Sequence, residues 1–395
     1  MIFPLILALG LTAPADTAAA SSGTAEPAAV IVHRQPAVPV LSLRLSLAVS
    51  DPPGYAGAGH LLQHFHDRAL RDRVSAAGGR LQYERNPDAV VYTVTGPAAE
   101  AGPLTEALLS VLRPPAPSAT GRLVVHRELR DERLAEWETA GAHVRTRLRH
   151  RLFPDDRPAP GTRSSAARIE DADLAALWNA LYDPSRVTVV AVGDVDPEAV
   201  RAAFARLPEG RPSALPPEED LPDETPLAEP QATRGWLGAG YPVTDADPAS
   251  VSIAARLLGD RLRRLLPEGE ISVDHWWTHR GQAMAAVVAV PGPRLGEARR
   301  LLDTALKDLG EELEDETVRE AGLALRREML FSSRTPDRMA ALIGGFADRT
   351  GSADGANRFH GRLREIRRAD VEEALREMIE SEQVRIDLPP QPLER

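Results

Sequence analysis

Cysteine is absent from this sequence of 395 residues. Its absence excludes disulfide bonds, thiol nucleophiles and cysteine-ligated zinc together, so any bound metal must use His, Asp or Glu side chains. Positive charge is also scarce, because 47 Lys and Arg face 58 Asp and Glu and leave a formal net charge of −11. This deficit argues against nucleic acid and anionic membrane as main partners. Glycine-rich phosphate loops are missing as well, since Val192-Gly193-Asp194 lacks the glycine pattern of a dinucleotide or P-loop site.

Long apolar runs are missing too. Residues 1–11 are apolar but too few to span a bilayer, and small residues that suit an A-x-A cleavage site follow them. We interpret residues 1–24 as a secretory signal peptide with a disordered start. This interpretation predicts export, to the periplasm or the extracellular space, and no transmembrane span. The alternative is an N-terminal segment that is buried in the fold.

The chain does contain enough apolar side chains, 43% of its residues, to form a sizeable core, and its length suggests about two domains. Residues 208–230 are rich in Pro, Glu and Asp and show no periodicity, which is typical of an extended linker. We therefore predict an N-terminal domain at 25–208, a linker at 209–232 and a C-terminal domain at 233–390. The order of strands and helices in the second domain echoes the first, which indicates an internal duplication.

The first domain contains clearly periodic segments. Residues 41–49 alternate apolar and polar side chains and predict a strand. A glycine-containing turn leads from this strand into a helix that should begin near His60 and end at the glycines that start at Gly78. Two strands of a hairpin are expected next, at 81–83 and 90–94.

Two histidines stand at helical spacing in this predicted helix. His60 and His64 are four residues apart, so their imidazoles leave the same face and can bind one metal ion. Such a pair is also common on a partly exposed helix that binds nothing. A catalytic zinc commonly takes three protein ligands and one water, and the helix expected from about residue 120 carries an acidic stripe, Glu128, Glu132 and Glu136. By itself, an acidic stripe with interleaved arginines is typical of a solvated helix face.

Several segments, in this order, resemble one family of enzymes. They are the helix entry Gly57-Ala58-Gly59-His60-Leu61-Leu62-Gln63-His64, the Gly78-Gly79 stop before a strand pair, the helix segment Val124-Val125-His126-Arg127-Glu128-Leu129, and Tyr182-Asp183-Pro184 before the strand at 189–195. Over nearly all of the mature chain, the sequence resembles the insulinase/pitrilysin family of zinc metallopeptidases, the inverzincins.

The resemblance implies an α+β fold with two homologous halves, each a mixed or antiparallel sheet covered by helices, around a chamber that takes unfolded peptides. It implies zinc as the cofactor, with His60, His64 and Glu128 as the metal ligands. It also places Gln63 at the position of the family's catalytic glutamate. Two nearby residues rank below this set as ligands, His66 and Glu132.

The sequence departs from the family at positions that matter for catalysis. Gln63 carries an amide, which has no basic oxygen near neutral pH and cannot act as the general base. Gln82 and Tyr83 stand where the family offers an Asn-Ala pair to the substrate backbone, so we assign these two residues to substrate binding. Gly121 replaces an acidic residue two turns before the third ligand. The Arg and Tyr that hold the substrate carbonyl in the family have no clear counterpart at 262–277.

These observations lead to one main hypothesis and two alternatives. The main hypothesis is a family member that binds zinc but is inactive or weakly active, and that serves as the non-catalytic subunit of a two-chain peptidase or as a peptide-binding module. Its partner would be an unfolded peptide or a catalytically competent chain of the family, in a hetero- or homodimer. The first alternative is an active zinc endopeptidase that uses another carboxylate, such as Glu84 or Glu132, as the base. The second is a metal-free structural homologue.

Overall fold

The computed structural model describes residues 29–49, 51, 55–85, 89–113, 115, 118–154, 169, 171–205, 207 and 230–391. The predicted signal peptide at 1–24 and most of the predicted linker at 209–232 lie outside the described residues. Both therefore stay predictions, as does the export that the first implies. Among the described helices, none combines the length and the apolar character that crossing a membrane requires.

The first half of the chain forms a five-stranded sheet with the strand order β1-β5-β2-β4-β3. β1 runs parallel to β5, and all other neighbours in this sheet pair antiparallel. The strands are β1 (Ala29–Arg34), β2 (Val40–Ala48), β3 (Arg80–Arg85), β4 (Ala89–Pro97) and β5 (Val187–Gly193). The α-helices of this half are α1 (Ala58–Ala76), α2 (Ala101–Leu109), α3 (Ala119–Glu138), α4 (Ala140–Leu152), α6 (Asp171–Leu181) and α7 (Pro197–Phe204).

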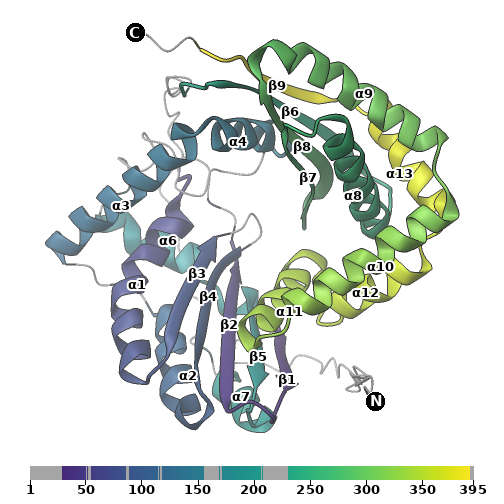
Figure 1. Ribbon diagram of the computed structural model, residues 1–395. Coiled ribbons are helices and arrows are strands. Elements are labelled where there is room, and N and C mark those ends of the chain that lie inside the picture. Colours follow the sequence, from purple (N-terminus) through teal and green to yellow (C-terminus); the bar gives the residue numbers. More distant parts are fainter. Residues whose placement is uncertain are drawn as a thin grey trace.

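The second half forms a four-stranded antiparallel sheet with the order β7-β8-β6-β9. Its strands are β6 (Arg234–Val243), β7 (Glu270–Thr278), β8 (Gly281–Pro291) and β9 (Val384–Leu388). Its α-helices are α8 (Pro248–Leu265), α9 (Leu295–Glu311), α10 (Asp315–Ser332), α11 (Pro336–Thr350), α12 (Gly355–Glu365) and α13 (Arg368–Glu380). The two sheets, each covered by helices, confirm the predicted α+β class (Figure 1).

The strand at 41–49 is buried on both faces rather than on one. Its leucines, such as Leu43 and Leu45, belong to the core of the first half, as the alternation predicts. Its polar residues Ser42, Arg44 and Ser46 are also almost fully buried, although a half-buried strand would expose them to water. The reason lies 300 residues away, because α11 of the second half packs on β2, β5 and β4.

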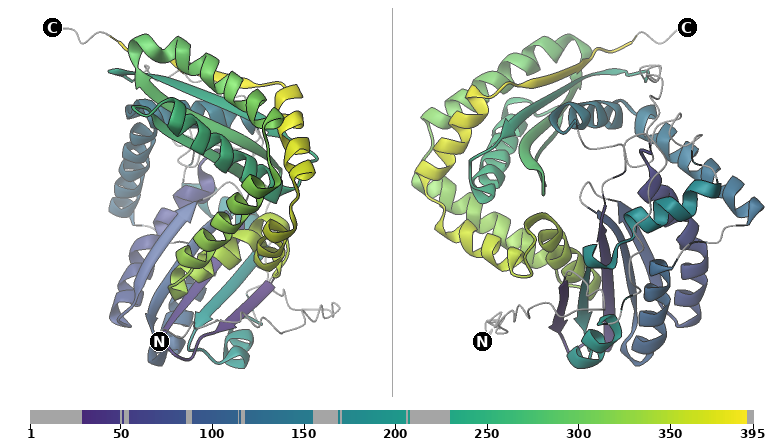
Figure 2. Two further views of the ribbon diagram at one scale, coloured as in Figure 1. Left: turned by 45° about the vertical axis from the view of Figure 1, so that its right-hand side comes forward. Right: turned by 180° about the vertical axis from the view of Figure 1, so that it is seen from behind.

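The packing of α11 has a counterpart in the other half. Helix α4 of the first half packs on β6, β9 and β8 of the second sheet, so each half lends one helix to the other half's sheet (Figures 1 and 2). Two glycines of β6 permit this approach. A Cβ at Gly238 would lie 2.7 Å from Val144, and one at Gly240 would lie 2.6 Å from Leu152. The exchange agrees with an internal duplication and joins the two halves into one folded body.

Candidate metal site

The start of α1 is fixed by a carboxylate and by a glycine. Asp51 accepts hydrogen bonds from the backbone N–H groups of Gly57 and Gly59, at 2.8 and 2.9 Å, so a negative charge caps the positive end of the helix. Gly57 has a φ of 86°, a left-handed conformation that a glycine adopts without strain. These features set the direction of the first two turns, which carry His60 and His64.

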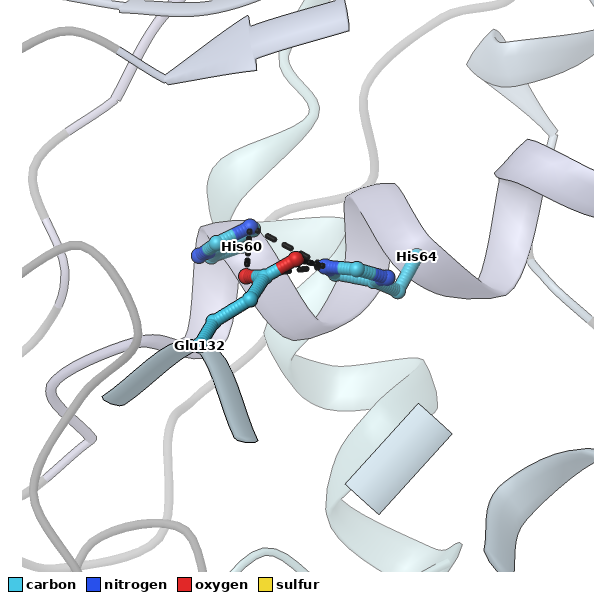
Figure 3. Close-up of side chains that lie close together, drawn as sticks. All are labelled: His60, His64 and Glu132. Atoms are coloured by element: carbon cyan, nitrogen blue, oxygen red, sulfur yellow. Dashed lines mark hydrogen bonds and ion pairs between the residues drawn. The ribbon is translucent and has the colours of Figure 1, made fainter. Parts of the chain in front are cut away.

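Three side chains converge at these turns (Figure 3). The Nε2 atoms of His60 and His64 lie 3.1 Å apart. The carboxylate of Glu132, from α3, approaches both rings, with its Oε2 3.2 Å from His60 Nε2 and its Oε1 3.3 Å from His64 Nε2. Among the described residues, His60, His64 and Glu132 form the group of potential ligands whose donor atoms all lie within 4.8 Å of one another.

The spacing of these donor atoms suits zinc. Two ligands of a tetrahedral zinc ion, each bonded at about 2.0–2.1 Å, lie about 3.3 Å apart. The observed separations of 3.1, 3.2 and 3.3 Å match this value. Two imidazoles and one carboxylate are also a common ligand set for zinc in proteins. The three side chains therefore fit the metal that the sequence implies.

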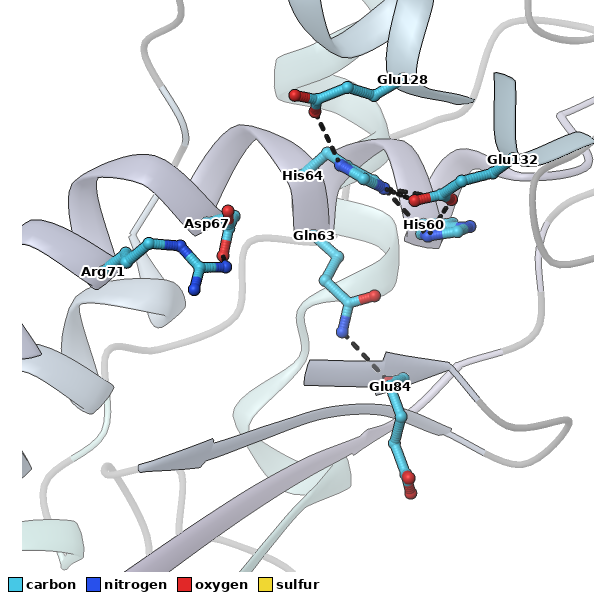
Figure 4. Close-up of polar contacts among 8 residues, drawn as sticks. All are labelled: His60, Gln63, His64, Asp67, Arg71, Glu84, Glu128 and Glu132. Carbon is cyan, nitrogen blue, oxygen red and sulfur yellow. Dashed lines mark hydrogen bonds and ion pairs between the residues drawn. The ribbon is translucent and has the colours of Figure 1, made fainter. Parts of the chain in front are cut away.

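Glu128 takes a different place in the site (Figure 4). Its Oε2 lies 3.2 Å from Nδ1 of His64, the ring nitrogen on the far side from His60 and Glu132. A carboxylate in this position orients a histidine ligand and raises its basicity, while a different group completes the metal set. The sequence prediction named Glu128 as the third ligand and ranked Glu132 below it. The structure instead brings Glu132 to the shared face of the two histidines.

The electrostatics of the cluster reflect these contacts. Burial opposes protonation of His64, but the hydrogen bonds and charges of Glu132 and then Glu128 outweigh it and raise the pKa of His64. Burial likewise opposes ionisation of Glu132, but His64 and His60 together lower the pKa of this carboxyl. A metal ion must therefore compete with protons for these ligands, so metal affinity should fall as the pH is lowered.

Gln63 does not face the histidines. Its side chain is fully buried, and its amide nitrogen donates to the carbonyl oxygens of Glu84 at 3.1 Å and Val91 at 3.0 Å. In Figure 4 it points toward β3, whereas Glu132 approaches His60 and His64 from the other side. Because both acceptors are carbonyl oxygens, only the NH₂ group fits between them. Gln63 therefore acts as a structural link between α1 and the β3–β4 hairpin.

The other residues that the sequence singled out differ in whether they contact the candidate metal ligands. Tyr83 on β3 packs its ring edge-on against His64, with centroids 5.8 Å apart. Gln82, its neighbour, is exposed. His66 lies against the rings of Tyr92 and Tyr182, and burial lowers the pKa of His66 to about 4.

Sequence periodicity could not decide between Glu128 and Glu132, because both glutamates occupy one helix face. They are one turn apart on α3, so periodicity cannot separate them. One signal in the sequence favours Glu132. The interval from His64 to Glu128 is shorter than the resemblance to the inverzincins implies, and Glu132 lengthens it by four residues. The side chain of Glu136 lies outside the described side chains.

Comparison of the sequence with families of known proteins gives one match. Residues 168–320 match the family described as "Peptidase M16 inactive domain". Among curated proteins, no sequence matches this chain.

Comparison of the fold with solved structures gives many matches. A protease from Helicobacter pylori superposes with a TM-score of 0.78 at 15% identity, covering 94% of this chain and 99% of that one. A peptidase M16 inactive domain from Pseudomonas fluorescens gives a TM-score of 0.75 at 17% identity, with coverage of 94% and 99%. A chain of Complex III2 from Candida albicans, with Inz-5 bound, gives 0.70 at 12% identity, with coverage of 91% and 93%. At these identities the likeness concerns the fold.

Proposed function

We propose that the chain is a zinc-binding, catalytically impaired member of the insulinase/pitrilysin (M16) family of peptidases and their non-catalytic relatives, because residues 168–320 match the M16 inactive domain and the fold resembles that of M16 peptidases. Its role would be that of a non-catalytic subunit or a peptide-binding partner. One observation carries the proposal. His60, His64 and Glu132 keep the spacing of a zinc site, while Gln63 takes no part in it.

The loss of a general base supports catalytic impairment. Zinc in such a site would polarise a carbonyl or activate a water, and the protein must supply a carboxylate that takes the proton. Glu132 contacts both histidines and is committed to the ligand group. Glu84 has an exposed side chain that extends away from the histidines (Figure 4). Neither of the two carboxylates named as examples of a substitute base, Glu84 and Glu132, is therefore placed to serve as one.

An exposed strand edge supports peptide binding. β3 is the last strand of its sheet, so one side of its backbone has no strand partner among the described residues. An extended peptide can add to such an edge through main-chain hydrogen bonds. Tyr83 lies on this strand and contacts His64, so a peptide bound here would run past the metal site. Gln82 and Tyr83 are accordingly the proposed peptide contacts.

A subunit role is supported by the fold's use elsewhere. The chain of Complex III2 from Candida albicans, which has this fold, is part of a multi-subunit assembly. A peptidase-like chain without a general base can contribute its zinc site and the edge strand β3 to a shared chamber. A second chain then supplies the catalytic residues that cleave the peptide. We propose a catalytically competent chain of the same family as this partner.

The decisive experiment is metal analysis of the purified chain by mass spectrometry, with four variants: His60→Ala, His64→Ala, Glu132→Gln and Glu128→Gln. We expect about one zinc per chain in the wild type and none in the two histidine variants. Glu132→Gln should contain no zinc at free-zinc concentrations at which the wild type is still fully occupied. Glu128→Gln should keep it with an affinity lower by about 10- to 100-fold, as expected for a group that only orients a ligand.

The matched glutamate pair decides which carboxylate is the ligand. If Glu128→Gln loses zinc and Glu132→Gln keeps it, the sequence-based choice of Glu128 is right and our assignment is wrong. Absence of zinc from the wild type would instead favour the metal-free homologue, in which Glu128 and Glu132 simply contact the histidine rings.

The partner role needs a separate test. The wild type alone should fail to cleave a library of unfolded peptides. It should co-purify as a stoichiometric complex with a chain from the same genome that carries an intact H-x-x-E-H motif. A chain that cleaves peptides by itself, or that stays monomeric beside such a partner, contradicts the proposal.

A further inference from the structure

A hollow apart from the metal site lies at the helices α10, α11 and α12 of the second half, and His33 of β1, from the first half, also lines it. Figure 1 shows where these elements lie. Its volume is about 470 Å³, within the roughly 300–1,000 Å³ that small-molecule sites commonly have. None of the residues of the candidate metal site lines it. Its chemistry can therefore be considered separately from the zinc proposal.

The lining is mainly apolar on two of the helices. Met329 and Leu330 come from α10, and Met339, Leu342 and Ile343 come from α11. Two of the five methionines of the sequence thus meet in this one place. Methionine is unbranched and flexible, so it adapts to ligands of varied shape. Leu330 is 44% exposed, which marks an apolar surface that the described chain leaves open to solvent.

The polar part of the lining is positively charged. Arg326 and Arg364 both line the hollow, and neither forms an ion pair with any residue that the structure describes. Nε of Arg326 lies 3.4 Å from Nε2 of His360, and burial and then the charges of Arg326 and Arg364 lower the pKa of His360. Asp354 is the acidic residue of the lining, and it accepts a hydrogen bond from Asn357 at 2.8 Å. Two arginines beside an apolar surface complement an anionic group attached to an apolar chain.

We propose that the hollow at α10, α11 and α12 binds a medium-chain fatty acid, with its carboxylate on Arg326 and Arg364 and its alkyl chain against the apolar residues of α10 and α11. The chemistry of the lining residues indicates which class of ligand fits. Helices supply most of the lining, apart from His33, Ser333 and Asp354, and the N–H and C=O groups of a helix backbone bond to each other within the helix. Against the apolar residues of α10 and α11, a peptide would bury backbone groups without partners, which is unfavourable, whereas an alkyl chain has no polar groups to satisfy.

The test uses laurate, below its micelle concentration, titrated calorimetrically into the full chain. We expect saturable one-to-one binding. Gly361 also lines the hollow, and a Cβ added there would meet no heavy atom within 4 Å. Gly361→Leu should therefore fold and yet fill the space, so that laurate no longer binds. Gly310→Leu, at a helical glycine of α9 that is equally free of neighbours, is the matched control and should bind as the wild type does.

Head-group recognition is tested with the double variant Arg326→Gln/Arg364→Gln. It should bind laurate at least about 10-fold more weakly, because charge-assisted hydrogen bonds are lost, while dodecanol should bind it and the wild type equally. Arg358→Gln, an exposed arginine of α12 outside the lining, should change nothing. The proposal is overturned if laurate fails to bind, if Gly361→Leu leaves its affinity unchanged, or if the double variant binds it normally. Tighter binding of acetyl-trileucine than of laurate would also overturn it, in favour of a peptide terminus.

Discussion

The guanidinium of Arg44 lies 2.7 Å from the carboxylate of Asp348, and both side chains are almost completely shielded from water, at 1% and 5% exposed. Arg44 belongs to β2 of the first half and Asp348 to α11 of the second. Ser46 donates a further hydrogen bond to Asp348 at 2.6 Å. Gly344, one turn earlier on α11, gives the guanidinium room, because a side chain there would collide with it. The ion pair thus joins the two halves of the chain inside the fold.

Removal of one partner of this buried pair should be severe. In Asp348→Ala the charge of Arg44 remains buried without a counterion, and the free energy of unfolding should fall by about 3–5 kcal/mol in urea unfolding. Arg80→Ala, which breaks the exposed pair between α11 and β3, is the control and should cost less than about 1 kcal/mol. The double replacement Arg44→Met/Asp348→Leu should recover much of the loss, because no uncompensated charge remains. Equal losses in Asp348→Ala and Arg80→Ala would show that the buried pair has no special role.

The packing of helix α4 on the second sheet can be tested where α4 comes very close to β6. Gly238→Ala places a methyl group 2.7 Å from Val144, so overpacking should lower the free energy of unfolding by about 1–3 kcal/mol. Adding Val144→Ala opens space for that methyl group. The loss in the double variant should therefore be smaller than the sum of the two single losses. Strict additivity would mean that α4 does not pack on β6 as described.

Restoring a glutamate at position 63 should not restore a peptidase. In Gln63→Glu, carboxylate oxygens replace the NH₂ group that serves the carbonyls of Glu84 and Val91. We expect no peptide cleavage and a free energy of unfolding lower by about 2–4 kcal/mol, since buried acceptors lose their donor and a charge is buried. Gln63→Met, which loses the donor without burying a charge, should be less affected. A stable and active Gln63→Glu would mean that the side chain turns toward the histidines.

Zinc binding should stabilise the chain. Free zinc at about 100 times its dissociation constant should raise the free energy of unfolding by about 2.7 kcal/mol, because the unfolded chain lacks the assembled site. Thermal unfolding with zinc and with a chelator measures this gain. His60→Ala should respond to neither. An equal response in this variant would place the bound zinc elsewhere.

Stability should also fall in mild acid, partly through His275 on β7. Burial lowers the pKa of His275 to about 4, although a hydrogen bond with Gln282 opposes this shift, and the charge of Arg349 lowers the pKa further. Between pH 6.5 and 4 the unfolded chain therefore binds a proton at this residue that the folded chain does not. By linkage, the free energy of unfolding decreases as the pH falls through this window.

The size of the acid effect follows from the pKa difference. His275 should contribute a loss of about 2 kcal/mol between about pH 7.5 and pH 5, at 1.36 kcal/mol for each unit of pKa. Urea unfolding at both pH values, for the wild type and His275→Gln, isolates this contribution from that of other groups. The variant should lose about 2 kcal/mol less than the wild type. The same loss in both proteins would mean that His275 titrates normally in the folded state.

Local sequence pattern predicted the parts of this protein that depend on near neighbours. The alternation in 41–49 gave β2, and the glycines after Ala76 ended α1 where the structure ends it. The four-residue spacing of His60 and His64 placed their side chains on one helix face, because helical geometry is the same wherever the helix packs. The order of motifs was enough to indicate the family and its two-sheet fold.

Contacts between distant segments decided the rest. Periodicity did not indicate β7 or α12, whose places depend on packing against other elements. Glu128 and Glu132 share a helix face, and only the packing of α3 on α1 determined which of them reaches both histidines. The burial of Arg44 depended on a helix 300 residues away, and the direction of Gln63 on a strand pair across from α1. The sequence by itself determined which residues share a helix face or a strand face, because these positions follow from local backbone geometry. Tertiary packing decided which of these residues come into contact, because the distances between helices and strands are not set by the local sequence.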